Sequence, residues 1–126
     1  MIIVKIIGGL GNQMFQYALG RYLSQKNNVE FKIDITGFES YKLHKYSLDA
    51  FNIKKNVATK NEIDRFEKYK TKPGKKWFLY NKLFSDSSKY FKEKSFDFDP
   101  DIMKLNDGVY IEGYFQSEKY VGNKIE

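Results

Sequence analysis

The sequence predicts an α/β domain built on a parallel sheet, and three observations predict it. Residues 2–7 are apolar and mostly β-branched, as in a strand covered on both faces. Glycines in residues 8–11 then break the run, and from residue 12 apolar side chains recur at helical spacing. Residues 29–34 alternate between apolar and polar, which predicts a second strand. Strand, helix and strand in succession form a right-handed βαβ unit, so we expect a Rossmann-like parallel sheet.

The first helix is expected from about Asn12 to Lys26, with Asn12 as its N-cap and Asn27–Asn28 as its end. Free N–H groups and the positive helix end at the 8–11 corner favour a phosphate, a carboxylate or a hydroxyl-rich ligand. The same glycines also suit a tight turn that binds nothing. The corner is no dinucleotide fingerprint, because Met14 replaces the third glycine, and no Gly-Lys-Ser/Thr of a P-loop follows.

Three carboxamides, Asn12, Gln13 and Gln16, stand in or near the first turn of this helix. A carboxamide both donates and accepts hydrogen bonds, which suits sugar hydroxyls and phosphate oxygens. The alternative for Gln13 and Gln16 is a solvated helix face.

Further along the chain the periodicity predicts shorter elements. The expected elements are a short strand at 54–59, a helix capped by Thr59 or Asn61 that runs to about Tyr69, an amphipathic helix at 77–84 packed on the sheet, strands at 90–93 and 109–114, and a helix that opens at Ser117.

Two titratable residues follow the second strand. Asp34 closes that strand at the edge where open sheets bind ligands, so it either holds a ligand hydroxyl or caps the next loop. His44 is the only histidine and lies in the loop that follows. A lone histidine is more often a surface or capping residue than a catalyst, but this loop adjoins the glycine corner.

Composition narrows the classes of function. The chain has no cysteine, which excludes disulfides and thiol chemistry, and with one histidine a dedicated zinc site is not expected. The apolar start is too short for a signal peptide, and no stretch reaches the length that spans a bilayer. The net charge of +6 is spread out. For the five lysines of residues 68–76 we favour a solvated loop over a nucleic-acid or membrane contact.

Three blocks of the sequence resemble the α-1,2-fucosyltransferases, glycosyltransferase family 11. Residues 8–18, Gly-Gly-Leu-Gly-Asn-Gln-Met-Phe-Gln-Tyr-Ala, look like the N-terminal signature of that family. Residues 45–53, Lys-Tyr-Ser-Leu-Asp-Ala-Phe-Asn-Ile, are similar to its K-Y-x-L-D-x-F-x-I segment, and residues 107–120 resemble its third block. The blocks occur in family order and span nearly the whole chain.

The resemblance implies the N-terminal, acceptor-side half of a GT-B-type enzyme, with residues 1–126 as one Rossmann-like domain and the C-terminal donor-binding domain absent. It implies transfer of L-fucose from GDP-fucose to the 2-hydroxyl of a galactoside acceptor glycan, with inversion and without a metal or other cofactor. It also implies a cytoplasmic bacterial enzyme of surface polysaccharide synthesis, with no nucleic-acid partner. A weaker hypothesis comes from the residues themselves: a basic peripheral protein that uses residues 68–76 and 77–84 on a membrane, at the inner face of the bacterial membrane, or on a nucleic acid.

Site residues follow from the resemblance and from the edge of the sheet. We expect catalytic roles for Asn12 and Glu112. Asp34 and His44 are the alternative bases, and a solvated or salt-bridged acid is the alternative for Glu112. The expected substrate-binding residues are Gly8, Gly9, Gly11, Gln13, Asp34, His44, Tyr114 and Gln116.

Two departures from the family limit the expected activity. The His-x-Arg-Arg-Gly-Asp motif that contacts the donor phosphates does not occur, and Gly9 stands where related fucosyltransferases place an Arg in a G-R-F-G-N-Q loop. Bidentate Arg–phosphate contacts are hard to replace. We therefore interpret the chain as a truncated portion with little or no activity alone. A competing hypothesis is a stand-alone Rossmann-like module that binds an anion or a sugar without catalysis.

Overall fold

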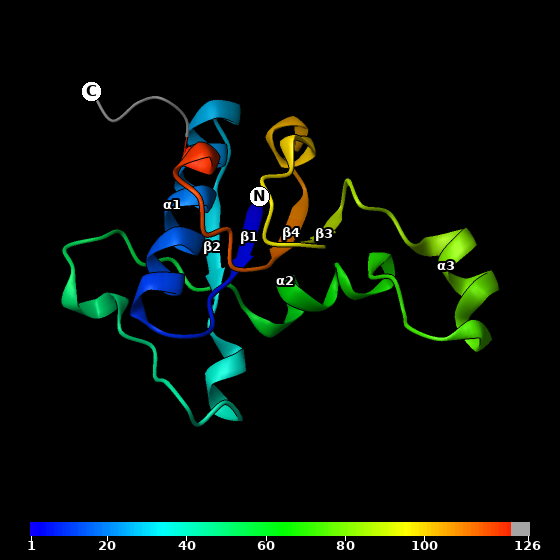
Figure 1. Ribbon diagram of the computed structural model, residues 1–126, viewed down its shortest axis with the longest axis horizontal. Coiled ribbons are helices and arrows are strands. Elements are labelled where there is room, and N and C mark those ends of the chain that lie inside the picture. Colours follow the sequence, from blue (N-terminus) through cyan, green and yellow to red (C-terminus); the bar gives the residue numbers. More distant parts are fainter. Residues whose placement is uncertain (122–126) are drawn as a thin grey trace.

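The computed structural model describes residues 1–121 and confirms an α/β fold with a parallel sheet (Figure 1). The helices and strands are β1 Ile2–Lys5, α1 Leu10–Asn27, β2 Phe31–Asp34, α2 Lys60–Asp64, α3 Phe78–Phe84, β3 Tyr90–Lys92 and β4 Val109–Glu112. Short 3₁₀ turns connect them at Thr36–Glu39, Leu48–Ala50, Glu67–Tyr69, Lys75–Trp77, Pro100–Lys104 and Glu118–Val121.

The four strands lie in the order β2-β1-β4-β3, and every neighbouring pair is parallel. Ile2 of β1 is in register with Phe31 of β2 on one side and with Val109 of β4 on the other. The chain therefore leaves β1 toward β2, while β4 flanks β1 on the opposite side. This reversal makes the β1–β4 junction a topological switch point, where open sheets of this kind bind ligands.

The strands divide the core between two faces of the sheet, because successive side chains point to opposite sides. Ile2 and Val4 pack in one cluster with Leu19 and Leu23 of α1. Ile3 packs on the other face with a second cluster beside α2, which includes Phe66, Tyr90 and Tyr110. Lys5 and Glu112 each come two residues after a side chain of this second cluster, Ile3 and Tyr110, and Lys5 is in register with Asp34. All three charged residues at the strand ends therefore lie on the α2 face of the sheet.

Helix α1 begins two residues earlier than the sequence pattern predicts. Its N-cap is Gly9 in an extended conformation, and no side chain caps it, so the prediction of Asn12 as the N-cap is wrong. The glycines allow the backbone to enter helical geometry at Leu10, and Asn12 lies inside the first turn. At the other end the helix stops at Asn27, followed by Asn28 in the left-handed conformation, close to the predicted end.

The strand predicted at 54–59 is reduced to one bridge between Val57 and Ile33. The predicted cap at Thr59 is confirmed. Its hydroxyl oxygen accepts from the Glu62 N–H, and the Glu62 carboxylate accepts from the Thr59 N–H, so the two residues form a capping box. The helix is shorter than predicted, however, and ends at Asp64 before the 3₁₀ turn Glu67–Tyr69.

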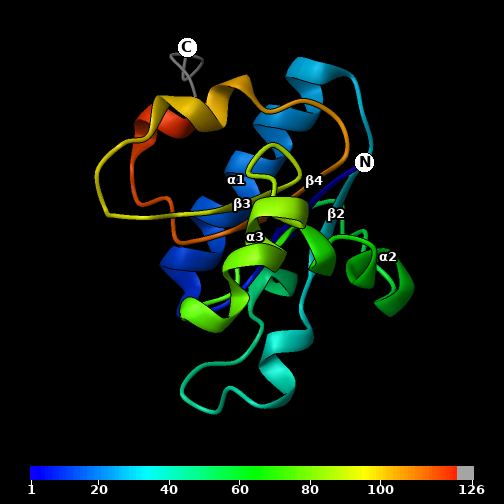
Figure 2. The ribbon, with the colours of Figure 1, turned by 90° about the vertical axis from the view of Figure 1, so that its right-hand side faces the viewer.

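Helix α3 is confirmed as a helix, but the prediction that it packs on the sheet is wrong. Figure 1 places α3 at the right-hand end of the molecule, and in Figure 2, viewed from that side, it stands in front of the sheet. Its partner is the preceding loop: Asn81 exchanges two hydrogen bonds of 2.8 Å with the backbone of Lys72. The helix predicted from Ser117 begins as the 3₁₀ turn Glu118–Val121, and its continuation lies outside the described residues.

The contact between α1 and β2 depends on a glycine in the middle of the helix. A Cβ atom at Gly20 would overlap the ring of Phe31, which is buried against α1. The helix and strand can approach this closely only because that atom is missing.

We predict that Gly20→Ala lowers the free energy of unfolding by about 1–3 kcal/mol, because overpacking outweighs the better helix propensity of alanine. Gly11→Ala is the matched control on the same helix, since nothing lies within 4 Å of a Cβ there. Urea denaturation measures both. Equal stability of the two variants would contradict the packing argument.

Candidate functional site at the carboxyl edge of the sheet

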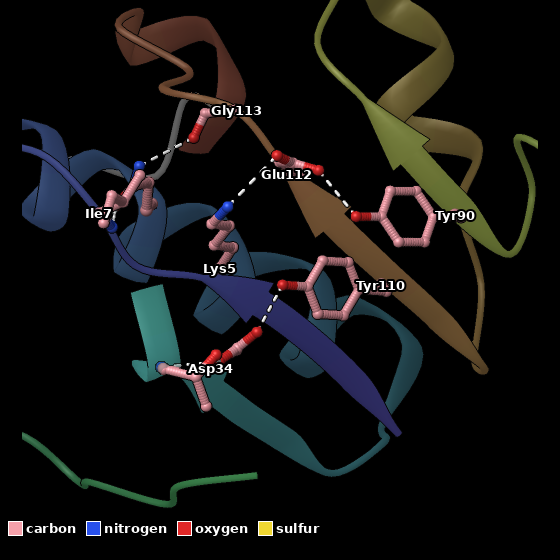
Figure 3. A network of polar contacts seen from close by, with 9 residues as sticks. Lys5, Ile7, Asp34, Tyr90, Tyr110, Glu112 and Gly113 are labelled. Carbon is pink, nitrogen blue, oxygen red and sulfur yellow. Dashed lines mark hydrogen bonds and ion pairs between the residues drawn. The ribbon is translucent and has the colours of Figure 1, made fainter. Parts of the chain in front are cut away.

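The carboxamide of Gln16 joins the ends of β1 and β4. Gln16 is fully buried; its Oε1 accepts from the Ile7 N–H at 3.0 Å, and its Nε2 donates to the Gly113 carbonyl at 2.9 Å. Ile7 and Gly113 follow the two central strands, and Figure 3 shows them facing each other across the switch point. Helix α1 thus carries the group that fixes the spacing of this edge.

Gln13 holds the following loop against the glycine corner in the same way. Its Nε2 donates to the carbonyls of Gly8 and Lys45, both at 2.9 Å, and its Oε1 accepts from the Ser47 N–H at 2.9 Å. The residue is fully buried, and both of its N–H groups are used by the protein. Gln13 was predicted to bind substrate, whereas in the structure it positions backbone.

The remaining predicted residues of the α1 side come together from three distant parts of the chain. A Cβ on Gly8 would lie 3.0 Å from Asn12 Nδ2 and 3.2 Å from the Tyr114 ring, and one on Gly9 would lie 3.5 Å from the His44 ring. Gln116 Nε2 also donates to Asn12 Oδ1. We call this group the α1 corner: Gly8, Gly9, Gly11, Asn12, His44, Tyr114 and Gln116.

The α1 corner has the electrostatics of an anion site. Helix α1 has no side-chain cap and no acidic residue in its first turn. Leu10 and Gly11 are exposed there, with open space beside Gly11. The positive helix end therefore faces solvent without a compensating carboxylate in the helix itself.

Asp34 lies on the other face of the sheet and is nearly saturated. Its Oδ1 accepts from the Thr36 N–H at 2.9 Å and from the Thr36 hydroxyl at 2.7 Å, while its Oδ2 accepts from the Tyr110 hydroxyl at 2.6 Å (Figure 3). Only 3% of the residue is exposed. Of the two roles that the sequence leaves open for Asp34, the structure shows the cap of the next loop.

Glu112 is the second carboxylate of the α2 face. Its Oε2 accepts from the Tyr90 hydroxyl at 2.7 Å, and its Oε1 lies 3.4 Å from Lys5 Nζ (Figure 3). Burial alone would raise the pKa of Glu112, but the hydrogen bond from Tyr90 and the nearby lysine charges outweigh it and hold the pKa below its usual value. Glu112 is therefore an ionised carboxylate at neutral pH, in the form that accepts a proton.

A cavity of about 410 Å³ opens beside this second group. Asp34 borders it together with three further acidic residues, Glu39, Asp64 and Glu67, whereas Glu112 is not part of its lining. Its lining includes Lys5, Asp34, Thr36, Lys70, Tyr90 and Tyr110.

The predicted site residues therefore fall into two groups. The α1 corner collects seven of them, Gln13 lies beneath it, and Asp34 and Glu112 lie on the α2 face. Sequence reasoning missed Lys5, Tyr90 and Tyr110, which fix the two carboxylates. Of these three residues, Lys5 could have been noticed in the sequence, because it is the single charged residue within the otherwise apolar run 2–7.

Within the described residues 1–121, no group of three or more His, Cys, Asp or Glu side chains is arranged to hold a metal ion. No helix in that part of the chain is long and apolar enough to cross a membrane.

The chain is 33% identical over 125 residues, 95% of its length, to an alpha-1,2-colitosyltransferase of Escherichia coli. The chain is related to a glycosyltransferase. It spans 40% of the length of that relative. No protein-family model matches the chain, and no solved structure gives a significant match.

We predict that Gln16→Met lowers the free energy of unfolding by about 2–4 kcal/mol, because the Ile7 N–H and the Gly113 carbonyl lose their partner. Gln25→Met is the control, since Gln25 is exposed on the same helix. Thermal and urea unfolding compare the two. A Gln16 variant as stable as the Gln25 variant would contradict a structural role for the buried carboxamide.

Proposed function

We propose that the chain is the N-terminal, acceptor-side domain of a GT-B-type α-1,2-glycosyltransferase that moves L-fucose from GDP-fucose to a galactoside. One observation carries this proposal: the three blocks that resemble the family meet around the N-terminus of α1. Gln13 of the first block bonds Lys45 and Ser47 of the second, and Gln16 bonds Gly113 of the third. The related glycosyltransferase matches over the same length of chain.

The donor phosphates would lie against the α1 corner. Negative charge grows on the leaving diphosphate as the glycosidic bond breaks, and uncapped N–H groups of a long helix stabilise such charge without a metal. His44 would take part of the role that an Arg plays in related loops, because its ring lies beside Gly9, 3.5 Å from where a Cβ atom at that position would be. We therefore propose that the transfer needs no metal ion.

The acceptor would lie at the same corner, toward β4. Asn12, Tyr114 and Gln116 offer amide and ring surfaces suited to sugar hydroxyls and to the apolar face of a hexose. Glu112, which the sequence suggests as the general base, is the last residue of β4 and lies on the α2 face, so it does not face an acceptor at this corner. Among the candidate bases, His44 is the one that belongs to the α1 corner.

A second donor is favoured by the relative. That protein is named as a colitosyltransferase. Colitose is L-fucose without the 3-hydroxyl, so one site can accept either sugar unless a polar group is committed to that hydroxyl. Transfer assays with the two GDP-sugars in parallel separate the donors.

We predict that Asn12→Ala weakens the binding of a methyl β-galactoside about tenfold, the effect of losing one or two hydrogen bonds. Asn61→Ala is the control, because Asn61 is exposed on α2. Isothermal titration calorimetry measures both, with circular dichroism to check folding. Equal affinity of the two variants would remove Asn12 from the acceptor site.

We also predict that the chain alone forms no fucosylated product from GDP-fucose and a β-galactoside, because it has no Arg-Arg pair for the donor phosphates. Mass spectrometry of the acceptor after long incubation is the measurement. Robust turnover would refute the proposed division of labour between domains. Binding of the galactoside without any transfer when a donor domain is supplied would favour the stand-alone binding module.

A further inference from the structure

Within the segment 68–84, Tyr69 packs against the second core cluster of the sheet, whereas the part from Lys72 onward is bonded to the segment itself. Asn81 bonds both backbone groups of Lys72 at 2.8 Å, and the Tyr80 hydroxyl donates to the Lys68 carbonyl at 3.1 Å. The Lys72 ammonium lies 4.3 Å from the ring centre of Trp77 and 4.4 Å from that of Tyr80. One face of α3 is therefore fully engaged with the loop before it.

The opposite face of α3 is apolar and points to solvent. Phe78 is 71% exposed, Leu79 64% and Leu83 65%. A surface helix of a globular domain normally turns such side chains toward the core. Here the polar and aromatic face is inside and the leucines are outside, so the apolar face has no partner within the described residues.

The charged side chains around this apolar face are all lysines. Residues 68–84 contain six lysines and no aspartate or glutamate. None of the six forms an ion pair in the part of the chain that the structure describes. Lys75 and Lys76 are exposed immediately before α3, and Lys82 is exposed on the helix between the leucines.

We propose that the outer face of α3 rests on an anionic lipid bilayer, with Phe78, Leu79 and Leu83 in the interface and the lysines on the headgroups. A helix that lies on a membrane surface inserts apolar side chains into the interface and places flanking lysines on anionic headgroups. A nucleic acid would use the lysines but gain little from exposed leucines. A second copy of the same face would bring twelve lysines of like charge together, which opposes association. This inference does not depend on the proposed glycosyl transfer.

Vesicle flotation tests the inference directly. The chain is mixed with vesicles of phosphatidylcholine and phosphatidylglycerol in equal parts, or with vesicles of phosphatidylcholine alone. We expect it to float with the anionic vesicles only, and to be released by high salt because screening weakens the lysine contribution.

The charge contribution is tested with Lys75→Glu/Lys76→Glu. We expect the partition coefficient on anionic vesicles to fall about thirtyfold or more, since each lysine near an anionic surface contributes about fivefold. Lys54→Glu/Lys94→Glu is the matched control, because it makes the same charge change at exposed lysines elsewhere. The control should bind nearly as well as the parent chain.

The apolar contribution is tested with Leu79→Gln/Leu83→Gln, which we expect to reduce partition at least about tenfold. Leu43→Gln/Phe96→Gln removes two side chains that are each 77% exposed at other places and should have little effect. Circular dichroism confirms that all variants are folded.

Five results would overturn the inference. The first four are absence of flotation, equal flotation with neutral vesicles, equal loss in the matched controls, and a salt-stable dimer that disappears in the Leu79/Leu83 variant. Competition by an oligonucleotide that leaves the Leu79/Leu83 variant unaffected would assign the lysines to nucleic acid and equally overturn it.

Discussion

One buried carboxamide sets the geometry on which the carboxyl edge depends. The backbone just beyond a strand end has lost its ladder partner, and a buried N–H or C=O left unpaired there costs free energy. Gln16 satisfies one such group after β1 and one after β4 from a single position on α1. Any shift of the helix along the sheet would break both bonds, so the helix, the two strands and the switch point hold one arrangement.

Gln13 extends this constraint to the loop that carries His44. With three hydrogen bonds to backbone groups, it fixes the 44–47 segment relative to the glycines. As a result, side chains from three segments that are far apart in the sequence surround the uncapped N-terminus of α1. This convergence gives the resemblance to glycosyltransferases a physical meaning. The first and third blocks supply side chains of the corner, and the second block is the segment through which Gln13 holds the loop of His44.

On the α2 face, the two carboxylates are held by tyrosine hydroxyl groups and not by carboxamides. Asp34 and Glu112 each accept from a tyrosine hydroxyl, from Tyr110 and Tyr90 respectively. The two rings stack with centres 4.9 Å apart, so the carboxylates are linked through a rigid aromatic pair. Burial and the neighbouring carboxylates raise the pKa of both tyrosines, which keeps their hydroxyl groups protonated as donors.

The α/β class, the βαβ unit and the edge that carries the predicted residues could be read from the sequence, because strand and helix periodicities are local properties. The roles of individual polar residues could not be predicted from the sequence. Gln13 and Gln16 have the same local pattern as a solvated helix face, and only the return of 45–47 and 113 to that face makes them buried. Asn12 has a favoured N-cap side chain, yet the preceding glycines let the helix begin earlier. The sequence of α3 is amphipathic, but periodicity does not say which face finds a partner.

We propose that the α1 corner, rather than the cavity on the α2 face, receives the ligand. Amide chemical shifts of the labelled chain, recorded during titration with a β-galactoside, distinguish the two places. We expect the largest changes on residues 9–12, His44 and residues 114–116. Changes centred on Lys5, Asp34 and Lys70, with the α1 corner unmoved, would contradict it.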